Sequence, residues 1–233
     1  MASLEFNCLL GLEGIDPAKV IVLRHRPKEK KLRRVLPWLA AEQPNLFNAY
    51  QQVQGPKLEK AFLSIDFIAA FIGYASGRAV FVGLFRRKGQ ELVTRNTFLQ
   101  KPAVKRLTEM GMADADIRDT RYWFDLERTD LLRDYIGRLV INWPGGELSW
   151  WRRSERNHLQ VLAISEHDTL TTDVPLWNEL VLNWTELQHL PMSWKLTLGQ
   201  WRAIYHVFDT HSRRGYVGSA YGEQNLLQRW QEY

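Results

Sequence analysis

Two tyrosines and one arginine have the residue types and the spacing that phosphodiester chemistry could use. Tyr216 follows Tyr205 by eleven positions, and Arg229 comes after both. Cleavage of a phosphodiester needs an activated water, a cation that offsets charge on the phosphate, and a donor near the developing charge. Arg229 stays charged at any working pH and can bind a phosphate in a bidentate manner. A tyrosine hydroxyl, with a pKa of ~10, needs a nearby cation or metal to act as a general base.

A β-hairpin is expected to position the two tyrosines. Residues 203–209 alternate in the manner of a strand, 210–215 form a polar turn, and 216–219 return as the second arm. An apolar stripe then predicts a helix that begins near Glu223. Arg229 shares a face of this helix with Leu226 and Tyr233. The stripe consists of Leu226, Leu227 and Trp230.

Each of these residues also has an ordinary structural interpretation. Tyrosines in strands commonly pack in the core or form cross-strand pairs, and an arginine on a helix is commonly solvated. The residue types alone therefore leave both interpretations open.

The ordered set resembles the GIY-YIG nuclease superfamily. The resemblance rests on Ala203-Ile204-Tyr205, on Tyr216-Val217-Gly218 and on the helical Arg229. The similarity is greatest to the restriction-endonuclease-like branch and covers about residues 175–233. It includes the segment YVGSAYG followed by LLQRW, and the preceding segment LVLNWTELQHLPMSW. The resemblance implies that Tyr205 is the general base, that Tyr216 orients water or phosphate, and that Arg229 binds phosphate. It also implies that the complete module is a DNA-targeting defence or restriction-type endonuclease that uses a divalent metal, Mg²⁺.

The sequence departs from the family at two points. Ala203 stands where the family has a glycine, and the metal-binding glutamate of the family would fall beyond Tyr233. Glu223 and Glu232 lie beside the arginine on the same helix, and we assign neither to that role. We therefore expect a partial nuclease module without a metal ligand, inactive as given. The alternative is a non-catalytic DNA-binding or protein-interaction module with a remnant nuclease domain.

The steepest charge asymmetry lies in RHRPKEKKLRR, Arg24–Arg34, which we call the basic segment. It has seven basic residues and one acid, at a loop and the start of a helix. A solvated face and a phosphate-binding surface both fit this pattern. The candidate DNA-binding residues are Arg24, Arg26, Lys30, Lys31, Arg33 and Arg34.

A second candidate DNA contact combines tryptophan and arginine. Trp150 and Trp151 are adjacent, so in a strand they point to opposite faces and only one can enter a one-sided core. Such a mixture can stack on bases while it holds phosphates, whereas packing in the domain core is the competing interpretation. The patch consists of Trp143, Trp150, Trp151, Arg152, Arg153 and Arg156.

The pattern of elements predicts an α+β fold. Strands predominate up to residue 165, which favours a curled antiparallel sheet or small β-barrel with helices. Residues 67–74 and 78–87 read as a hairpin with the next turn at Gly89, and we expect Pro37 and Pro44 to break or cap the helical stretch before it. The predicted organisation is a DNA-recognition domain over 1–165, a connecting segment over 166–194 and a partial nuclease domain over 195–233.

Composition limits the class of protein. The chain has 233 residues, is 45% hydrophobic and carries a formal charge of +5, which fits a globular protein with a weak bias towards polyanions. Cys8 is the single cysteine, as is typical of a reducing, cytoplasmic setting. We expect neither export nor a membrane span, because the longest apolar run, Phe67–Ala75, falls short of the ~20 residues that span a bilayer. A partial module would leave apolar surface on its hairpin, which favours a homo-oligomer.

Overall fold

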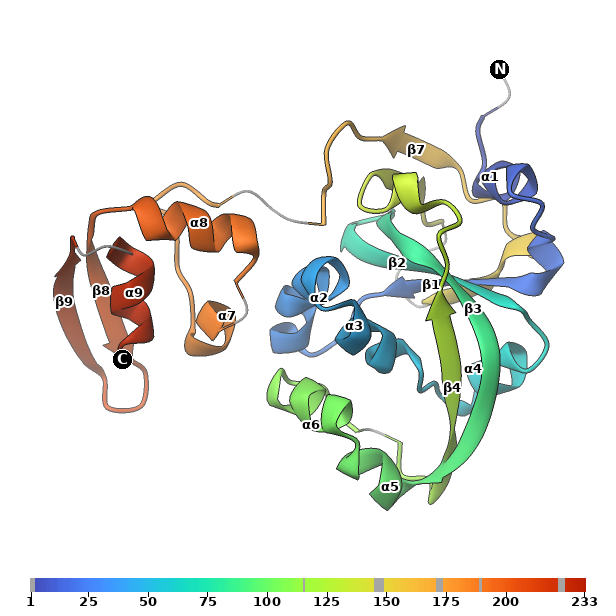
Figure 1. The fold of residues 1–233 in the computed structure, drawn as a ribbon, viewed down its shortest axis with the longest axis horizontal. Helices are drawn as coiled ribbons and strands as arrows, with labels where there is room; N and C mark the ends of the chain where they lie inside the picture. The colour runs from blue at the N-terminus through green and yellow to red at the C-terminus, as the bar shows by residue number, and fades with distance from the viewer. Residues whose placement is uncertain (1–2, 115, 145–148, 171–173, 189, 222–224) are drawn as a thin grey trace. The chain divides into compact units, whose positions relative to one another are not determined.

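The protein forms two compact units that each contain helices and strands (Figure 1), so the chain is of mixed α+β class. The computed structural model describes residues 3–114, 116–144, 149–170, 174–188, 190–221 and 225–233. The first unit comprises Met1–Leu170 and the second comprises Thr171–Tyr233.

A curled, mixed sheet forms the centre of the first unit. In the described residues its strands follow the order β6-β1-β2-β3-β5-β7, and β4 pairs with β3 outside this path. The strands are β1 (Val20–His25), β2 (Phe67–Ala75), β3 (Arg78–Thr94), β4 (Thr120–Arg128), β5 (Leu139–Asn142), β6 (Trp151–Arg153) and β7 (Val161–Ile164).

The prediction of a wholly antiparallel sheet is wrong at one pair of strands. β1 and β2 run parallel, with Val20 opposite Phe67 and His25 opposite Ile72. Three helices separate the two strands and return the chain to the same end of the sheet, as a parallel connection requires. These helices are α2 (Lys30–Glu42), α3 (Pro44–Gln51) and α4 (Pro56–Phe62).

The hairpin of β2 and β3 is confirmed, but the predicted turn at Gly89 is not. β3 continues through Gly89 to Thr94, and the irregular pairing with β4 lies between Arg87 and Gly89. Glycine marks a bulge here instead of a turn. Because β3 is so long, it pairs with β2 along its first half and with β4 along its second, and Figure 1 shows it curving between them.

Both faces of the sheet are covered. Alternate residues of β1 to β3, such as Ile21 and Ile68, pack beneath α2, α3 and α4. The intervening residues, such as Val22 and Phe71, pack beneath α1 (Phe6–Leu12). This two-sided burial explains why these strands read as nearly continuous apolar runs.

The two prolines of the helical stretch behave differently. Pro44 begins α3, where its missing N–H costs nothing. Pro37 lies inside α2, which continues past it, so the prediction that Pro37 ends the helix is wrong. Val35, Leu36 and Leu39 are buried on both sides of it, and their packing maintains the helix.

Two further α-helices precede β4, and the remaining α-helices of the described residues lie in the second unit. The first two are α5 (Arg95–Gln100) and α6 (Pro102–Glu109). The second unit contains α7 (Trp184–Gln188), α8 (Met192–Gln200), β8 (Ala203–Asp209), β9 (Arg214–Ala220) and α9 (Asn225–Gln231). A small core of its own joins these elements, with Leu187, Leu198, Tyr205, Leu226 and Leu227 at its centre.

Within the part of the chain that the structure describes, no helix combines the length and the apolar character needed to cross a bilayer.

Candidate functional site

The hairpin of β8 and β9 places both tyrosines on one face. Tyr205 lies opposite Gly218, and Tyr216 lies opposite Val207, two residues further along β8. Because side chains alternate between the faces of a strand, Tyr205, Val207, Tyr216 and Gly218 share one face. The predicted hairpin is confirmed, although the turn is shorter than expected because β9 already begins at Arg214.

Gly218 makes room for the two tyrosine rings. A Cβ atom built on it would lie 2.5 Å from the hydroxyl oxygen of Tyr205 and 2.8 Å from Cε1 of Tyr216. No side chain fits at such distances, so Tyr205 lies across this glycine and is itself buried. The glycine of the second motif therefore has a local packing role that is independent of any chemistry.

Packing of α9 against the hairpin determines where Arg229 lies. Leu226 and Leu227 are buried, and Trp230 packs edge-on against the Tyr205 ring with 6.3 Å between ring centroids. The main-chain N–H of Leu226 also donates to the carbonyl of Trp201, 3.1 Å away. These contacts fix the rotation of α9 and bring the turn that carries Arg229 towards Tyr205.

A third tyrosine joins the first two, and we call Tyr205, Tyr216 and Tyr233 the tyrosine cluster. The hydroxyl oxygens of Tyr205 and Tyr233 are 2.9 Å apart, and the rings of Tyr216 and Tyr233 are 6.0 Å apart. The hydrogen bond with Tyr205, followed by burial and by Tyr216, raises the pKa of the Tyr233 hydroxyl. Tyr233 thus lies between the two tyrosines that the sequence predicted.

Arg229 reaches the same cluster but is held by a carboxylate. Its Nη1 donates to Oε2 of Glu232 at 2.7 Å, and both side chains are exposed to solvent. The hydrogen bond and charge of Glu232, and then the proximity of Tyr205, raise the pKa of the guanidinium. The structure therefore brings Tyr205, Tyr216 and Arg229 together, and it adds Glu232 and Tyr233, which sequence reasoning did not assign to the site.

The carboxylates near the cluster do not fit a magnesium site. Among the described residues, no three His, Cys, Asp or Glu side chains lie close enough to hold a metal ion. Glu232 is engaged by Arg229, and Asp209 accepts main-chain N–H groups of His211 and Ser212 in the hairpin turn. Mg²⁺ needs carboxylate oxygens that face a shared position, and this arrangement offers none. Glu223 lies outside the described residues.

The basic segment is split between the interior and the surface. Arg24 is only 2% exposed and packs over the ring of Trp143, with 5.3 Å between its Cζ and the ring centroid. Burial, and then the charges of Arg26 and Arg152, lower the pKa of Arg24. In contrast, Lys30, Lys31, Arg33 and Arg34 are exposed at the start of α2, and Arg26 is half-buried.

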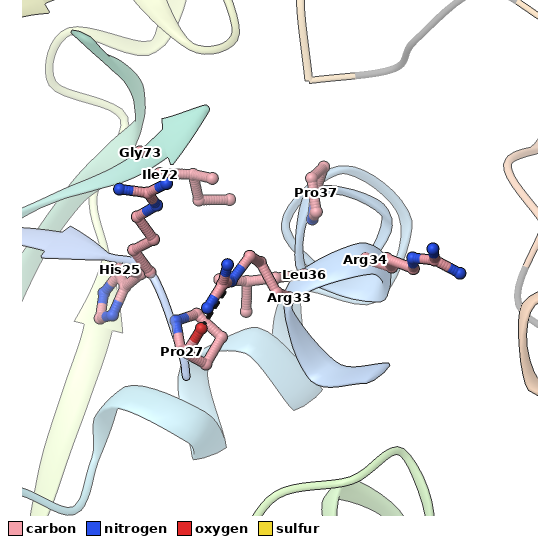
Figure 2. A pocket seen from close by; sticks show the side chains of 9 residues that line it. His25, Pro27, Arg33, Arg34, Leu36, Pro37, Ile72 and Gly73 are labelled. Atoms are coloured by element: carbon pink, nitrogen blue, oxygen red, sulfur yellow. Dashed lines mark hydrogen bonds between the residues drawn. The ribbon is translucent and has the colours of Figure 1, made fainter. Parts of the chain in front are cut away.

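A small basic cavity lies between the end of β1 and α2 (Figure 2). Its volume is about 270 Å³, and Arg26, Arg33 and Arg34 contribute to its lining. Figure 2 shows Arg33 turned towards Pro27, whose carbonyl accepts from Nε at 2.7 Å, and Arg34 directed away from both. Because three arginines contribute to its lining, this cavity is the part of the segment best suited to a phosphate.

His25 lines the same basic cavity from its buried side. It is 4% exposed, and its Nε2 lies 3.3 Å from Oε1 of Gln51. Burial lowers the pKa of His25 to about 4. The hydrogen bond with Gln51 acts to raise this pKa, but its effect is the smaller one. His25 is therefore neutral at pH 7 and adds no charge to the three arginines.

The predicted tryptophan and arginine patch is partly internal. Trp150 lies just before β6 and is exposed, whereas Trp151 in β6 is half-buried and packs against the core beneath α2. Trp143 is buried, and Arg152 lies over its ring with 5.1 Å between Cζ and centroid. Arg153 donates to the Ser64 hydroxyl at 2.9 Å. Trp150 and Arg156 are the exposed residues of this set and are best placed to meet a partner.

Comparisons of the chain with protein-family models, with curated proteins and with solved structures found no match.

Proposed function

We propose that the protein acts on DNA, with the first unit binding the DNA and the second supplying the tyrosine and arginine part of a GIY-YIG nuclease site. The observation that carries this proposal is the convergence of Tyr205, Tyr216 and Arg229 on one face of the hairpin and α9. These residues come from two strands and a helix. Their common location is what a shared phosphate ligand would require.

Each side chain has a role that fits its surroundings. The Tyr205 hydroxyl is the general base for the attacking water, and Arg229 lies close to it. Arg229 also binds the phosphate and offsets its developing charge. The side chain of Tyr216 is half exposed to solvent at the edge of the tyrosine cluster, and it orients the water or the phosphate. Because the described residues do not fit a magnesium site, no step of this scheme runs through a metal.

The first unit supports the DNA-binding part of the proposal. The exposed cations of α2 and the basic cavity provide positions for successive phosphates, and Trp150 provides a ring for stacking. The charge of +5 agrees in sign. We place this activity in the cytoplasm, where Cys8 stays reduced, and in the restriction or antiviral defence class that the sequence resembles.

A second candidate function is favoured by one observation. Glu232 holds Arg229, and Tyr233 hydrogen-bonds Tyr205, so both side chains that would act on phosphate already have intramolecular partners. A unit in which these contacts are permanent is a non-catalytic DNA-binding or protein-interaction module. We expect the 233-residue chain alone to bind DNA without cleaving it.

The test is nicking of supercoiled plasmid DNA, with Mg²⁺ and with a chelator. It is made on the 233-residue chain and on a product extended along the same reading frame. Nicking by the extended product should be lost in Tyr205→Phe and in Arg229→Ala, and DNA affinity should stay unchanged in Tyr205→Phe. Tyr221→Phe is the matched control, because Tyr221 is 72% exposed and belongs to the same segment but not to the cluster.

Nicking that survives both substitutions would refute the assigned roles. DNA binding without nicking by either product would select the non-catalytic candidate. Metal-dependent nicking by the 233-residue chain, abolished by Tyr205→Phe, would show that its own carboxylates rearrange to complete the site.

A further inference from the structure

A larger cavity lies elsewhere in the first unit, between the end of α3, α5 and the segment before β4, and we call it the α3–α5 cavity. Its volume is about 480 Å³, within the range of about 300–1,000 Å³ that is common for small-molecule sites. Aromatic and apolar side chains form much of its wall, among them Tyr50, Val53, Phe98 and Met112. Such a wall suits a ligand with apolar faces.

Arg121 lines this cavity from the start of β4 and is only 1% exposed. Its Nη1 donates to Oδ1 of Asp114 and its Nη2 to the carbonyl of Asp116, both at 2.7 Å. Its guanidinium lies over the ring of Phe98, 4.6 Å from the centroid. Its Nε has no hydrogen-bond partner among the described residues. A buried donor without a partner carries a desolvation cost.

The charges around the cavity compensate one another. Asp114 accepts from both Arg121 and Arg95, and Asp116 accepts from Arg118. Burial acts to raise the pKa of Asp114, but the hydrogen bonds and charges of Arg121 and Arg95 outweigh it and lower that pKa. The hydrogen bond from Arg118 is the main cause that lowers the pKa of Asp116. Both acids are therefore ionised and paired at pH 7, which leaves polar atoms but little net charge in the wall.

This combination selects a class of ligand. A free anion would meet Asp114 and Asp116, and a free cation would meet arginines that already hold those acids. A neutral, flat ligand with apolar faces and a hydrogen-bonding edge matches both parts of the wall. Nucleobases have this character, and proteins that read an unpaired base place it between aromatic or apolar side chains while polar groups meet its edge.

We propose that the α3–α5 cavity accepts a single nucleobase, with its edge towards the paired polar groups of Asp114 and Arg121. The inference rests on the proposed function, since DNA is the expected source of the base, while a free nucleotide is the other source of the same chemistry. The side chain of Arg95 is about half exposed beside Asp114, and Lys57 is exposed next to Pro56 at the wall. Both cations would attract the phosphates that flank an extruded base.

The experiment compares two surface substitutions to tryptophan. Ala113→Trp adds a large ring at an exposed position of the cavity wall, and Leu12→Trp adds the same ring to α1, where Leu12 is 82% exposed and does not line the cavity. Thermal melting of both variants verifies that each is folded. Fluorescence anisotropy then gives the Kd of each protein for a fully paired duplex and for the same duplex with one mispaired base, which is easier to extrude. Titration calorimetry with deoxyadenosine and thymidine monophosphates tests the free nucleotides.

We expect the unaltered protein and Leu12→Trp to prefer the mispaired duplex by about tenfold, equivalent to about 1.4 kcal/mol. Ala113→Trp should bind both duplexes as the unaltered protein binds the paired one. Binding of free nucleotides that Ala113→Trp abolishes, without a preference among duplexes, also supports the cavity and identifies the free nucleotide as the source. Tight binding of paired DNA with neither a preference nor nucleotide binding overturns the cavity and leaves the proposed function intact. Absence of all DNA and nucleotide binding overturns both.

Discussion

Replacement of Gly218 by alanine tests the packing on which the tyrosine cluster depends. The added Cβ would lie 2.6 Å from Cζ of Tyr205 and 2.8 Å from Cε1 of Tyr216, and both contacts are with rings that cannot bend. Tyr205 is buried beneath Trp230 and has little space to retreat. One ring must therefore leave its position or the two strands must separate.

The magnitude follows from the cost of inserting a methyl group into packed structure, which is about 1–3 kcal/mol. Gly199→Ala is the matched control, because a Cβ at Gly199 meets nothing within 4 Å and this residue lies in α8. Removing a glycine from a helix stabilises it by roughly 0.5–1 kcal/mol, with the smaller value near an end. The same chemical change in the same unit should thus have opposite signs at the two positions.

Hydrogen exchange measured by mass spectrometry is the suitable assay, since it reports the stability of the second unit separately from the first. We expect the amides of β8 and β9 to exchange roughly 5- to 150-fold faster in Gly218→Ala, which is the range that about 1–3 kcal/mol implies. Peptides from β1 to β3 serve as the internal reference. If the amides of β8 and β9 exchange at the same rate in Gly218→Ala, in Gly199→Ala and in the unaltered protein, Tyr205 does not lie across Gly218.

Three further outcomes are expected. His25→Gln should remove a loss of stability at low pH. The folded-state pKa of His25 is about 4 and the unfolded value is about 6.5, so the free energy of unfolding of the unaltered protein falls by up to about 3 kcal/mol as the pH falls through this interval. Urea midpoints of the variant should not show this loss. Joint replacement of Lys30, Lys31 and Arg34 by glutamine should weaken DNA binding and reduce the slope of log K against log salt by about 2–3, and an unchanged slope would refute phosphate contact by α2. Ile204→Lys should raise the dissociation constant of self-association at least about tenfold in sedimentation experiments. Ile204 is 80% exposed on the side of the hairpin opposite the tyrosine cluster, so the added charge would lie in the expected contact. An unaltered protein that stays monomeric at high concentration would contradict this.

Local patterns predicted the elements of this protein better than their pairing. The alternation around Tyr205 and the polar turn after it identified the hairpin, because a hairpin is specified by residues close in sequence. Phe71 and Phe81, each two residues before a glycine, imitate the tyrosine motifs but lack a hydroxyl, which is typical of core strands. Both rings are fully buried, 5.2 Å apart.

The features that the sequence did not reveal depend on long-range contacts. The direction of β1 relative to β2 is decided by how three helices pack, and no short window of sequence encodes that choice. Gly89 reads as a turn until the pairing with β4 is known, since only a partner strand makes it a bulge. The burial of Arg24 follows from Trp143, a residue more than a hundred positions away.

The candidate site shows the same division. The approach of Arg229 to Tyr205 was predictable, because the apolar stripe of α9 fixes its rotation. The place of Tyr233 in the cluster could also have been predicted, because Tyr233 lies four residues after Arg229 on the same face of the helix. The α3–α5 cavity had only a weak signal, the alternating acids and arginines around residues 114–121. The structure shows that these acids and arginines pair with one another, Arg121 with Asp114 and Arg118 with Asp116.

The pairing of β1 with β6 has a consequence for the synthesis of the chain. β1 needs residues 151–153 to complete its hydrogen bonds, and the N–H of Phe6 donates to the carbonyl of Leu159 at 2.8 Å. A ribosome must therefore deliver about 160 residues before the first strand and α1 reach their final partners, so the apolar side chains of α1 emerge long before they can be covered. The second unit, by contrast, joins strands that are neighbours in sequence and can fold as soon as they emerge. Refolding from denaturant should accordingly show a fast phase from the hairpin and a slower one from closure of the N-terminal sheet, and nascent chains that stop before β6 should depend on chaperones.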